Sequence, residues 1–154
     1  MNTRGFTLVE LLVVIGIMTI LSTLATLGWN RMSTKAAIEG QIKTVHADMM
    51  RIRLEALYSK QARRVEVAGN TFRIYPADVN TDTPVEVKSF KYEFKNISSA
   101  FVFNTSGMAS GYEGSVCVDK VSDAFVDSLV VTDGRISLGK NTGTNCVSAQ
   151  ITKR

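Results

Sequence analysis

The chain has 154 residues, of which 45% are hydrophobic and 21% charged, and its net charge is +4. This length suits one domain with a sizeable core, and the composition excludes an intrinsically disordered chain. One histidine and two cysteines exclude a multi-disulfide scaffold and leave too few ligands for a zinc site built from His and Cys.

An apolar segment opens the chain. No charged residue occurs from Leu11 to Asn30. At a rise of ~1.5 Å per residue, a helix of this length crosses most of a hydrocarbon core of ~30 Å. We therefore expect residues 6–30 to span a membrane once and residues 31–154 to form a water-soluble domain. No Ala-x-Ala site follows the apolar run, so ordinary signal-peptidase cleavage is not expected.

Glu10 lies at the edge of this apolar run, where an ionised carboxylate is costly without a partner. One interpretation places Glu10 at the level of the lipid headgroups. The other pairs it with a cation from another chain.

The residues around Glu10 form a recognisable motif. Arg4-Gly5-Phe6-Thr7-Leu8-Val9-Glu10, followed by the apolar run, resembles the cleavage and methylation motif of type IV prepilins and type II secretion pseudopilins. The resemblance implies that an inner-membrane prepilin peptidase removes a leader, residues 1–5, by cleaving after Gly5, and that Phe6 is N-methylated. It also implies a filament in which Glu10 meets the Phe6 amine of a neighbouring subunit.

The same resemblance sets the orientation. Arg31 and Lys35, just past the apolar run, would by charge alone favour the cytoplasmic side for the domain. The family instead implies a single-pass inner-membrane protein with its C-terminal domain in the periplasm. Leu27 stands where major pilins usually carry proline, which puts local melting of the helix there in doubt.

Helical periodicity continues past the apolar run. A stripe of apolar residues with alternating spacings of four and three predicts one helix from about residue 7 to about residue 62, amphipathic over 31–62. We expect this stripe to cover the strands that follow, with a coiled coil to another chain as the alternative. The stripe consists of Ile38, Ile42, Val45, Met49, Ile52 and Ala56.

The remaining residues, 64–154, alternate like β-strands. Gly69-Asn70 and Asp133-Gly134 are hairpin signals between apolar runs. Six or seven short strands after a long helix predict an α+β fold, with an antiparallel β-sheet packed on the helix. The expected strands include residues 65–67, 72–74, one long strand over 85–94, and 101–103, 115–118, 129–131, 136–138 and 146–151.

The later segments carry a narrower resemblance. The helix end at 48–56, Phe101 to Gly107 with Gly111, and Val130 to Ile136 resemble the H-type minor pseudopilins of type II secretion and the FimT-like minor pilins. This implies a pilin-like fold and a non-enzymatic filament subunit of a pseudopilus or a type IV pilus, without cofactors or a small-molecule substrate. Its implied partners are other subunits, the peptidase and the inner membrane. A single-pass membrane enzyme or sensor is disfavoured, because no catalytic constellation is visible.

Cys117 and Cys146 enclose 28 residues in apolar surroundings. A periplasmic domain favours a disulfide between them, and two buried thiols are the alternative. His46 has no visible partner and is expected to be a solvated or rim residue. The loop from Asp78 to Asp82 partly matches a calcium loop but lacks its glycine and its final glutamate, so a plain polar loop is expected.

DNA is the alternative partner. Some FimT-like pilins bind DNA through a Gly-Arg-x-Arg motif, whereas this chain has Gly134-Arg135-Ile136-Ser137 and lacks the second arginine. Arg135 would be the main contact, with Lys140, Lys153 and Arg154 adding phosphate contacts. Residues 65–154 hold nine basic and ten acidic groups, so we expect weak binding.

Overall fold

The computed structural model describes residues 6–76, 83–96, 100–109 and 114–154 and, for residues 24–27 and 96, the backbone only. Two compact units make up the chain, residues 1–34 and residues 35–154. The helix is α1 (Leu8–Ser59), and the strands in the described ranges are β1 (Arg63–Ala68), β2 (Thr71–Tyr75), β3 (Glu86–Ser89), β4 (Phe94–Asn96), β5 (Ala100–Phe103), β6 (Gly114–Val118), β7 (Ser128–Val131), β8 (Ile136–Asn141) and β9 (Ile151–Lys153), with a short 3-10 helix, η1 (Ser148–Gln150), before β9.

The helix ends three residues before the predicted position. Lys60 has a φ of 55°, the left-handed conformation that commonly follows the last helical turn. Glycine usually occupies that position, so a lysine gives no signal in the sequence. The Ser59 hydroxyl also donates to the Glu55 carbonyl at 2.6 Å, a local side-chain bond within the last turn.

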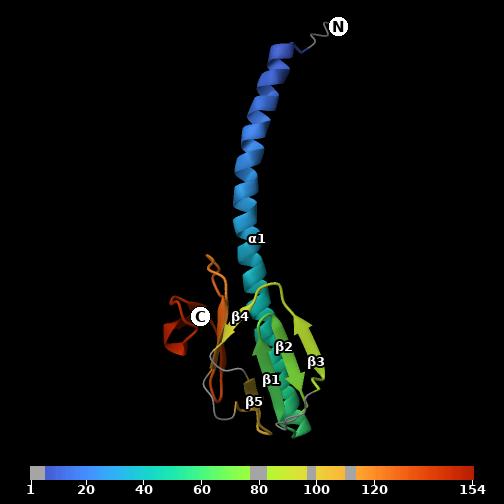
Figure 1. Ribbon diagram of the computed structural model, residues 1–154, viewed down its shortest axis with the longest axis vertical. Helices are drawn as coiled ribbons and strands as arrows, with labels where there is room; N and C mark the ends of the chain where they lie inside the picture. The colour runs from blue at the N-terminus through green and yellow to red at the C-terminus, as the bar shows by residue number, and fades with distance from the viewer. Residues whose placement is uncertain (1–5, 77–82, 97–99, 110–113) are drawn as a thin grey trace. The chain divides into compact units, whose positions relative to one another are not determined.

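The β-strands form two antiparallel sheets. The first has the order β3-β2-β1-β5 and the second the order β4-β6-β7-β8-β9. The hairpin expected at Gly69-Asn70 is present, with Val67 opposite Phe72, and so is the hairpin at Asp133-Gly134, with Val131 opposite Ile136. Figure 1 shows β1 and β2 running alongside the second half of α1. The α+β prediction is confirmed, with the antiparallel strands divided between two sheets.

The single long strand expected over 85–94 is wrong. It is divided into β3 and β4, which belong to different sheets. The crossing passes Tyr92, whose backbone is bound on both sides by one side chain: Gln41 Nε2 donates to the Tyr92 carbonyl at 2.7 Å, and the Tyr92 N–H donates to Gln41 Oε1 at 3.1 Å. Gln41 on α1 is 7% exposed, so it satisfies a crossing that would otherwise leave two backbone groups unpaired near the core.

The core lies between α1 and the two sheets. All six residues of the predicted stripe on α1 are 0% exposed, which confirms that the stripe packs within the chain. Side chains on the inner faces of both sheets complete the same cluster, with the fully buried aromatic rings at its centre. These include Val65, Val67, Phe72, Ile74, Phe101, Phe103, Val116, Leu129, Val131 and Ile136.

A second, small cluster covers the outer face of the second sheet. It contains Cys117, Val130, Cys146 and Ile151. Because residues after β8 fold back over this face, every residue of β6 and β7 is buried, on both sides of the sheet. The strand expected over 146–151 is wrong for most of its length. Local turn bonds, from Val147 N to the Asn145 carbonyl and from Gln150 N to the Val147 carbonyl, replace strand pairing there.

Candidate functional site

The N-terminal motif caps its own helix. Gly5 lies outside the described residues, and Phe6, 79% exposed, precedes α1. The Glu10 N–H donates to Thr7 Oγ1 at 3.2 Å, so Thr7 is the N-cap and Glu10 the third helical residue. A carboxylate at this position is favoured by the helix dipole. Thr7-x-x-Glu10 is a capping-box pattern, a signal that the sequence analysis missed.

Glu10 is exposed, and among the described residues its carboxylate has no hydrogen-bond or ion-pair partner. The capping geometry explains why a carboxylate suits this position within one chain. It leaves the charge available to a second molecule. The pairing of Glu10 with a neighbouring Phe6 amine therefore stays a prediction.

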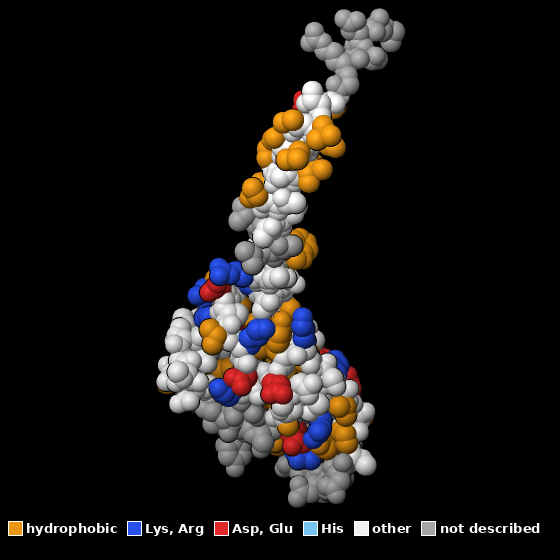
Figure 2. Space-filling model, turned by 45° about the horizontal axis from the view of Figure 1, so that its top comes forward, with side chains coloured by type: hydrophobic (Ala, Val, Ile, Leu, Met, Phe, Trp, Pro, Cys, Tyr) orange, Lys and Arg blue, Asp and Glu red, His pale blue; other side chains and the backbone are white. Residues whose placement is uncertain are grey.

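The first half of α1 is apolar and uncovered. Within the described residues, α1 is the one helix long and apolar enough to cross a membrane, and its most apolar 18-residue window has a mean hydropathy of 2.4 and is 0% buried. Large side chains such as Leu8 and Ile20 are 79% and 65% exposed, and Figure 2 shows them around the helix. Apolar surface on this scale requires cover from lipid or from other subunits.

The two cysteines form a disulfide, as predicted. Cys117 on β6 and Cys146 in the segment before η1 are joined with a Cα–Cα distance of 5.8 Å. Ser115 Oγ, on the same face of β6, donates to the Cys146 carbonyl at 2.7 Å. These two contacts attach the C-terminal segment to the outer face of the second sheet.

The candidate DNA contacts do not form one cluster. Arg135 is exposed beside the β7–β8 turn, whereas Lys153 pairs with Gly139 near the other end of β8. Lys140 is engaged within the domain, because its Nζ donates to Asp127 Oδ2 at 2.5 Å and to the Ser122 carbonyl at 2.7 Å. The Arg154 guanidinium lies 3.9 Å from the centre of the Phe125 ring. Few phosphate contacts are thus available to a single duplex.

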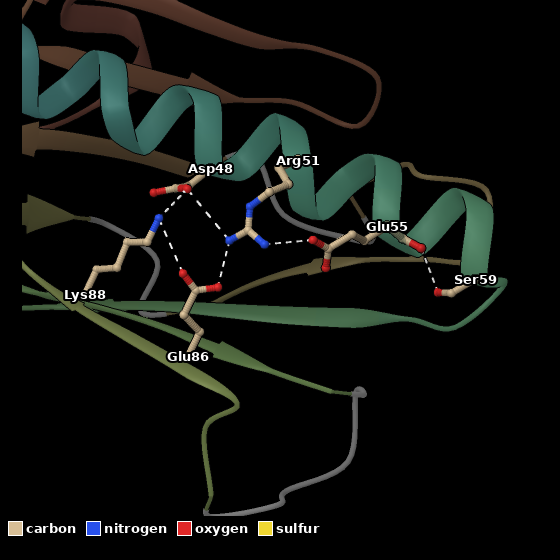
Figure 3. Close-up of polar contacts among 6 residues, drawn as sticks. All are labelled: Asp48, Arg51, Glu55, Ser59, Glu86 and Lys88. Carbon is tan, nitrogen blue, oxygen red and sulfur yellow. Dashed lines mark hydrogen bonds and ion pairs between the residues drawn. The ribbon is translucent and has the colours of Figure 1, made fainter.

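A charged network joins α1 to the edge strand β3 (Figure 3). Lys88 Nζ donates to Asp48 Oδ1 at 2.6 Å, and Arg51 donates to Glu55 at 2.7 Å and to Glu86 at 2.8 Å. The hydrogen bond from Arg51 lowers the pKa of Glu86, and the hydrogen bond to Asp48 raises the pKa of Lys88.

This network occupies positions that the alternation of β3 would assign to the core. Glu86 pairs with Ile74 and Lys88 with Phe72, both buried, while Val87 faces outward and is 51% exposed. Inward-pointing charges on an edge strand oppose unwanted pairing with other strands. The network therefore holds β3 against α1 and protects the edge of the first sheet from pairing with other strands.

The other candidates are His46, the loop from Asp78 to Asp82 and a surface pocket. His46 is half-buried, with Nε2 3.3 Å from the Ile136 carbonyl, which agrees with a rim residue. Asp78 to Asp82 lie outside the described residues, and Ser89 belongs to β3. A surface pocket of about 520 Å³ is lined by Lys95, Lys140, Asp127 and neighbouring residues. Two of the three lysines that line it, Lys95 and Lys140, are ion-paired, with Asp119 at 3.0 Å and Asp127 at 2.5 Å, and the third is Lys120.

Comparison with known proteins gives a sequence match at the N-terminus and a structural match to the fold. Residues 1–26 match the family model described as the prokaryotic N-terminal methylation motif. No curated protein matches the chain. The fold is similar to crystal structures of the type IV minor pilin FimU of Pseudomonas aeruginosa strain PAO1, in two crystal forms. They are 18% identical, with TM-scores of 0.56 and 0.52, and the matches cover 77% and 73% of this chain and 98% of each FimU chain.

The chain is a type IV pilin-like protein. It joins the N-terminal methylation motif to a fold similar to that of a minor pilin, and these two findings support the type IV pilin and pseudopilin superfamily. The minor-pilin and pseudopilin resemblance of the sequence is therefore confirmed at the level of the superfamily.

Proposed function

We propose that this protein is a minor pilin or pseudopilin that enters the inner membrane through residues 6–30 and is then assembled into a type IV pilus or a type II secretion pseudopilus. One observation carries the proposal: the N-terminal methylation motif, residues 1–26, includes the start of an apolar, uncovered helix that continues into a pilin fold. An apolar helix with so much exposed surface is not stable in water, and it needs cover from lipid or from other helices. Membrane anchoring followed by packing into a filament would provide each cover in turn.

Assembly is favoured over enzymatic activity and over DNA uptake. The described residues contain no cluster of three or more metal-binding side chains, and His46 is committed to the rim. DNA uptake through Arg135 has less support, because Lys140 is ion-paired and Lys153 and Arg154 lie elsewhere on the sheet. A periplasmic location of residues 31–154 is part of the proposal, and a disulfide suits that compartment.

The proposal is tested by processing. Co-expression with a prepilin peptidase should remove residues 1–5 and leave an N-methylated Phe6, because Gly5-Phe6 lies immediately before the apolar helix. Intact mass spectrometry of the membrane-extracted protein measures both changes. A Gly5→Leu variant should keep its full mass under the same conditions. An unprocessed mass for the wild type, or cleavage near Ala25, would contradict the proposal.

Glu10 should be needed for assembly and dispensable for insertion. Its carboxylate has no partner within the described chain, so Glu10→Ala removes a costly charge from the edge of the apolar run without breaking an ion pair. We expect normal membrane extraction and strongly reduced incorporation into filaments co-assembled with the major subunit. The control Thr7→Ser keeps the helix cap and should assemble normally. Filament incorporation of Glu10→Ala at the wild-type level would refute the pairing with a neighbouring Phe6 amine.

A further inference from the structure

Two large apolar side chains are exposed in the loop between β6 and β7, beside basic residues. Val121 is 102% exposed and Phe125 57% exposed. Lys120 precedes Val121, and the guanidinium of Arg154 lies over the Phe125 ring. We call Lys120, Val121, Phe125, Lys153 and Arg154 the entry surface, because it lies at the end of the domain where the chain enters it, as the next contacts show.

The loop is held in place and does not depend on burial of its apolar side chains. The Phe125 N–H donates to Glu39 Oε1 at 2.7 Å, which ties the loop to the first turns of α1 within the domain. Lys140 Nζ donates to the Ser122 carbonyl at 2.7 Å. Ala124 and Val126 are buried on either side of Phe125. The fold thus holds Val121 fully exposed and Phe125 more than half exposed under the Arg154 guanidinium, so burial of Val121 contributes nothing to stability.

The cations of this surface are not neutralised by carboxylates of the described residues: Lys120 Nζ lies 4.8 Å from the centre of the Tyr92 ring, and the Arg154 guanidinium lies over Phe125. Within the described part of the chain, Lys120, Lys153 and Arg154 form no ion pair with a carboxylate, in contrast to the neighbouring Lys95 and Lys140. Asp123, also exposed in the loop, offsets one of the three charges. The surface is therefore basic and apolar at once, a combination typical of segments that lie on acidic lipid headgroups.

The entry surface lies close along the chain to the apolar helix, and this identifies lipid headgroups as the molecules that it would contact. Lys35 is the first residue of the domain, and Trp29 closes the apolar run six residues earlier. Even a fully extended chain of that length spans only about 20 Å. Tryptophan favours the boundary between lipid and water, so a chain anchored through residues 6–30 keeps the entry surface near the headgroups.

We propose that the entry surface docks on the acidic phospholipids of the membrane that holds the apolar helix. The inference rests on the proposed membrane anchoring. Val121 and Phe125 enter the headgroup layer, and Lys120, Lys153 and Arg154 bind lipid phosphates. Docking would hold the domain against the membrane before assembly, and extraction into a filament would have to break it. Nucleic acid fits less well, because Val121 offers no ring on which a base can stack and the Arg154 guanidinium already lies over the Phe125 ring.

The test uses the full chain reconstituted in vesicles, with an environment-sensitive fluorophore on Val121→Cys. The native cysteines are joined in a disulfide and do not compete for the label. Vesicles of phosphatidylcholine alone are compared with vesicles that also contain phosphatidylglycerol. We expect a blue shift in the acidic vesicles that added salt reverses.

A second variant removes the charge. Replacing Lys120, Lys153 and Arg154 by glutamine in the labelled chain should lower the ratio of docked to undocked protein about a hundredfold, if each cation contributes about 1 kcal/mol. The matched control places the label on Ser106→Cys, an exposed residue in the turn beside Gly107, which packs against Arg53 farther along α1. This label should report water in both kinds of vesicle.

The outcomes separate docking from anchoring. Flotation with the vesicles but no shift at position 121 would overturn docking and leave anchoring intact. Failure to float would overturn both. An equal shift at positions 121 and 106 would show general adhesion and overturn the assigned surface. A shift in phosphatidylcholine vesicles that appears only when a DNA duplex is added would assign the surface to nucleic acid.

Discussion

Both halves of α1 carry apolar side chains that need cover from water, and the two halves differ in what provides that cover. In the domain, the stripe from Ile38 to Ala56 is completely buried against two sheets, whereas Leu8 to Leu21 present exposed apolar side chains that no described residue covers. Both halves are regular helix. The difference shows that the second half is stabilised by its own fold, and that the first half depends on a membrane or on other subunits.

The sharpest way to test this contrast is the same substitution in each half. Ile42→Ala removes a side chain that is 0% exposed, and we expect it to lower the free energy of unfolding of the domain by roughly 2–5 kcal/mol. Ile17→Ala changes a side chain that is 54% exposed and should alter domain stability by less than about 0.5 kcal/mol. Denaturant unfolding of both variants in detergent, followed by circular dichroism, measures the difference. Equal losses would show that the two halves unfold as one unit.

The features that sequence predicted correctly are those set by local pattern. The stripe on α1 has strict helical spacing, and the two hairpins carry glycine in short turns, so the helix and both hairpins could be located. The pilin resemblance came from the short motif around Gly5 and Glu10, which its residue types alone define.

The errors arose where distant contacts override the local pattern. Alternation from Val85 to Phe94 looked like one strand, but Gln41, far away in sequence, binds the backbone of Tyr92 and directs the chain from one sheet to the other. In β3 the charged residues face inward because Asp48 and Arg51 on α1 supply partners. Likewise, Lys140 is paired with Asp127 and is therefore not free to contact DNA, and no spacing in the sequence predicts this ion pair.

The disulfide should raise the free energy of unfolding of the domain without affecting the apolar half of α1. Replacing Cys117 and Cys146 together by serine opens a link between residues 29 apart, and the chain-entropy model gives a loss of about 3.6 kcal/mol. We expect a lower melting temperature for the domain and unchanged flotation with vesicles, because the apolar half of α1 contains no cysteine. A reductant should destabilise the wild type by a similar amount and have no further effect on the double variant. Free thiols in the untreated native protein would contradict this.

The smallest expected effect belongs to the charged network of β3, and its signature is its pH dependence. Arg51 lowers the pKa of Glu86 below the unfolded value of about 4.3, so the contribution of Glu86 is complete above that pH and is lost as pH falls through the folded value. Glu86→Gln should therefore destabilise the domain slightly at neutral pH. The difference from the wild type should shrink in acid.

Salt and a matched glutamate distinguish this network from a general effect of charge. The side chain of Glu86 is 37% exposed, so added salt should also reduce the difference. Glu93 is exposed and forms no ion pair in the described part of the chain, so Glu93→Gln should leave stability unchanged at every pH. If instead the effect of Glu86→Gln persists undiminished in acid, Glu86 contributes to stability through packing at the sheet edge and not through its charge. The charged network would then add nothing to the contrast between the two halves of α1, which would rest on cover of apolar side chains.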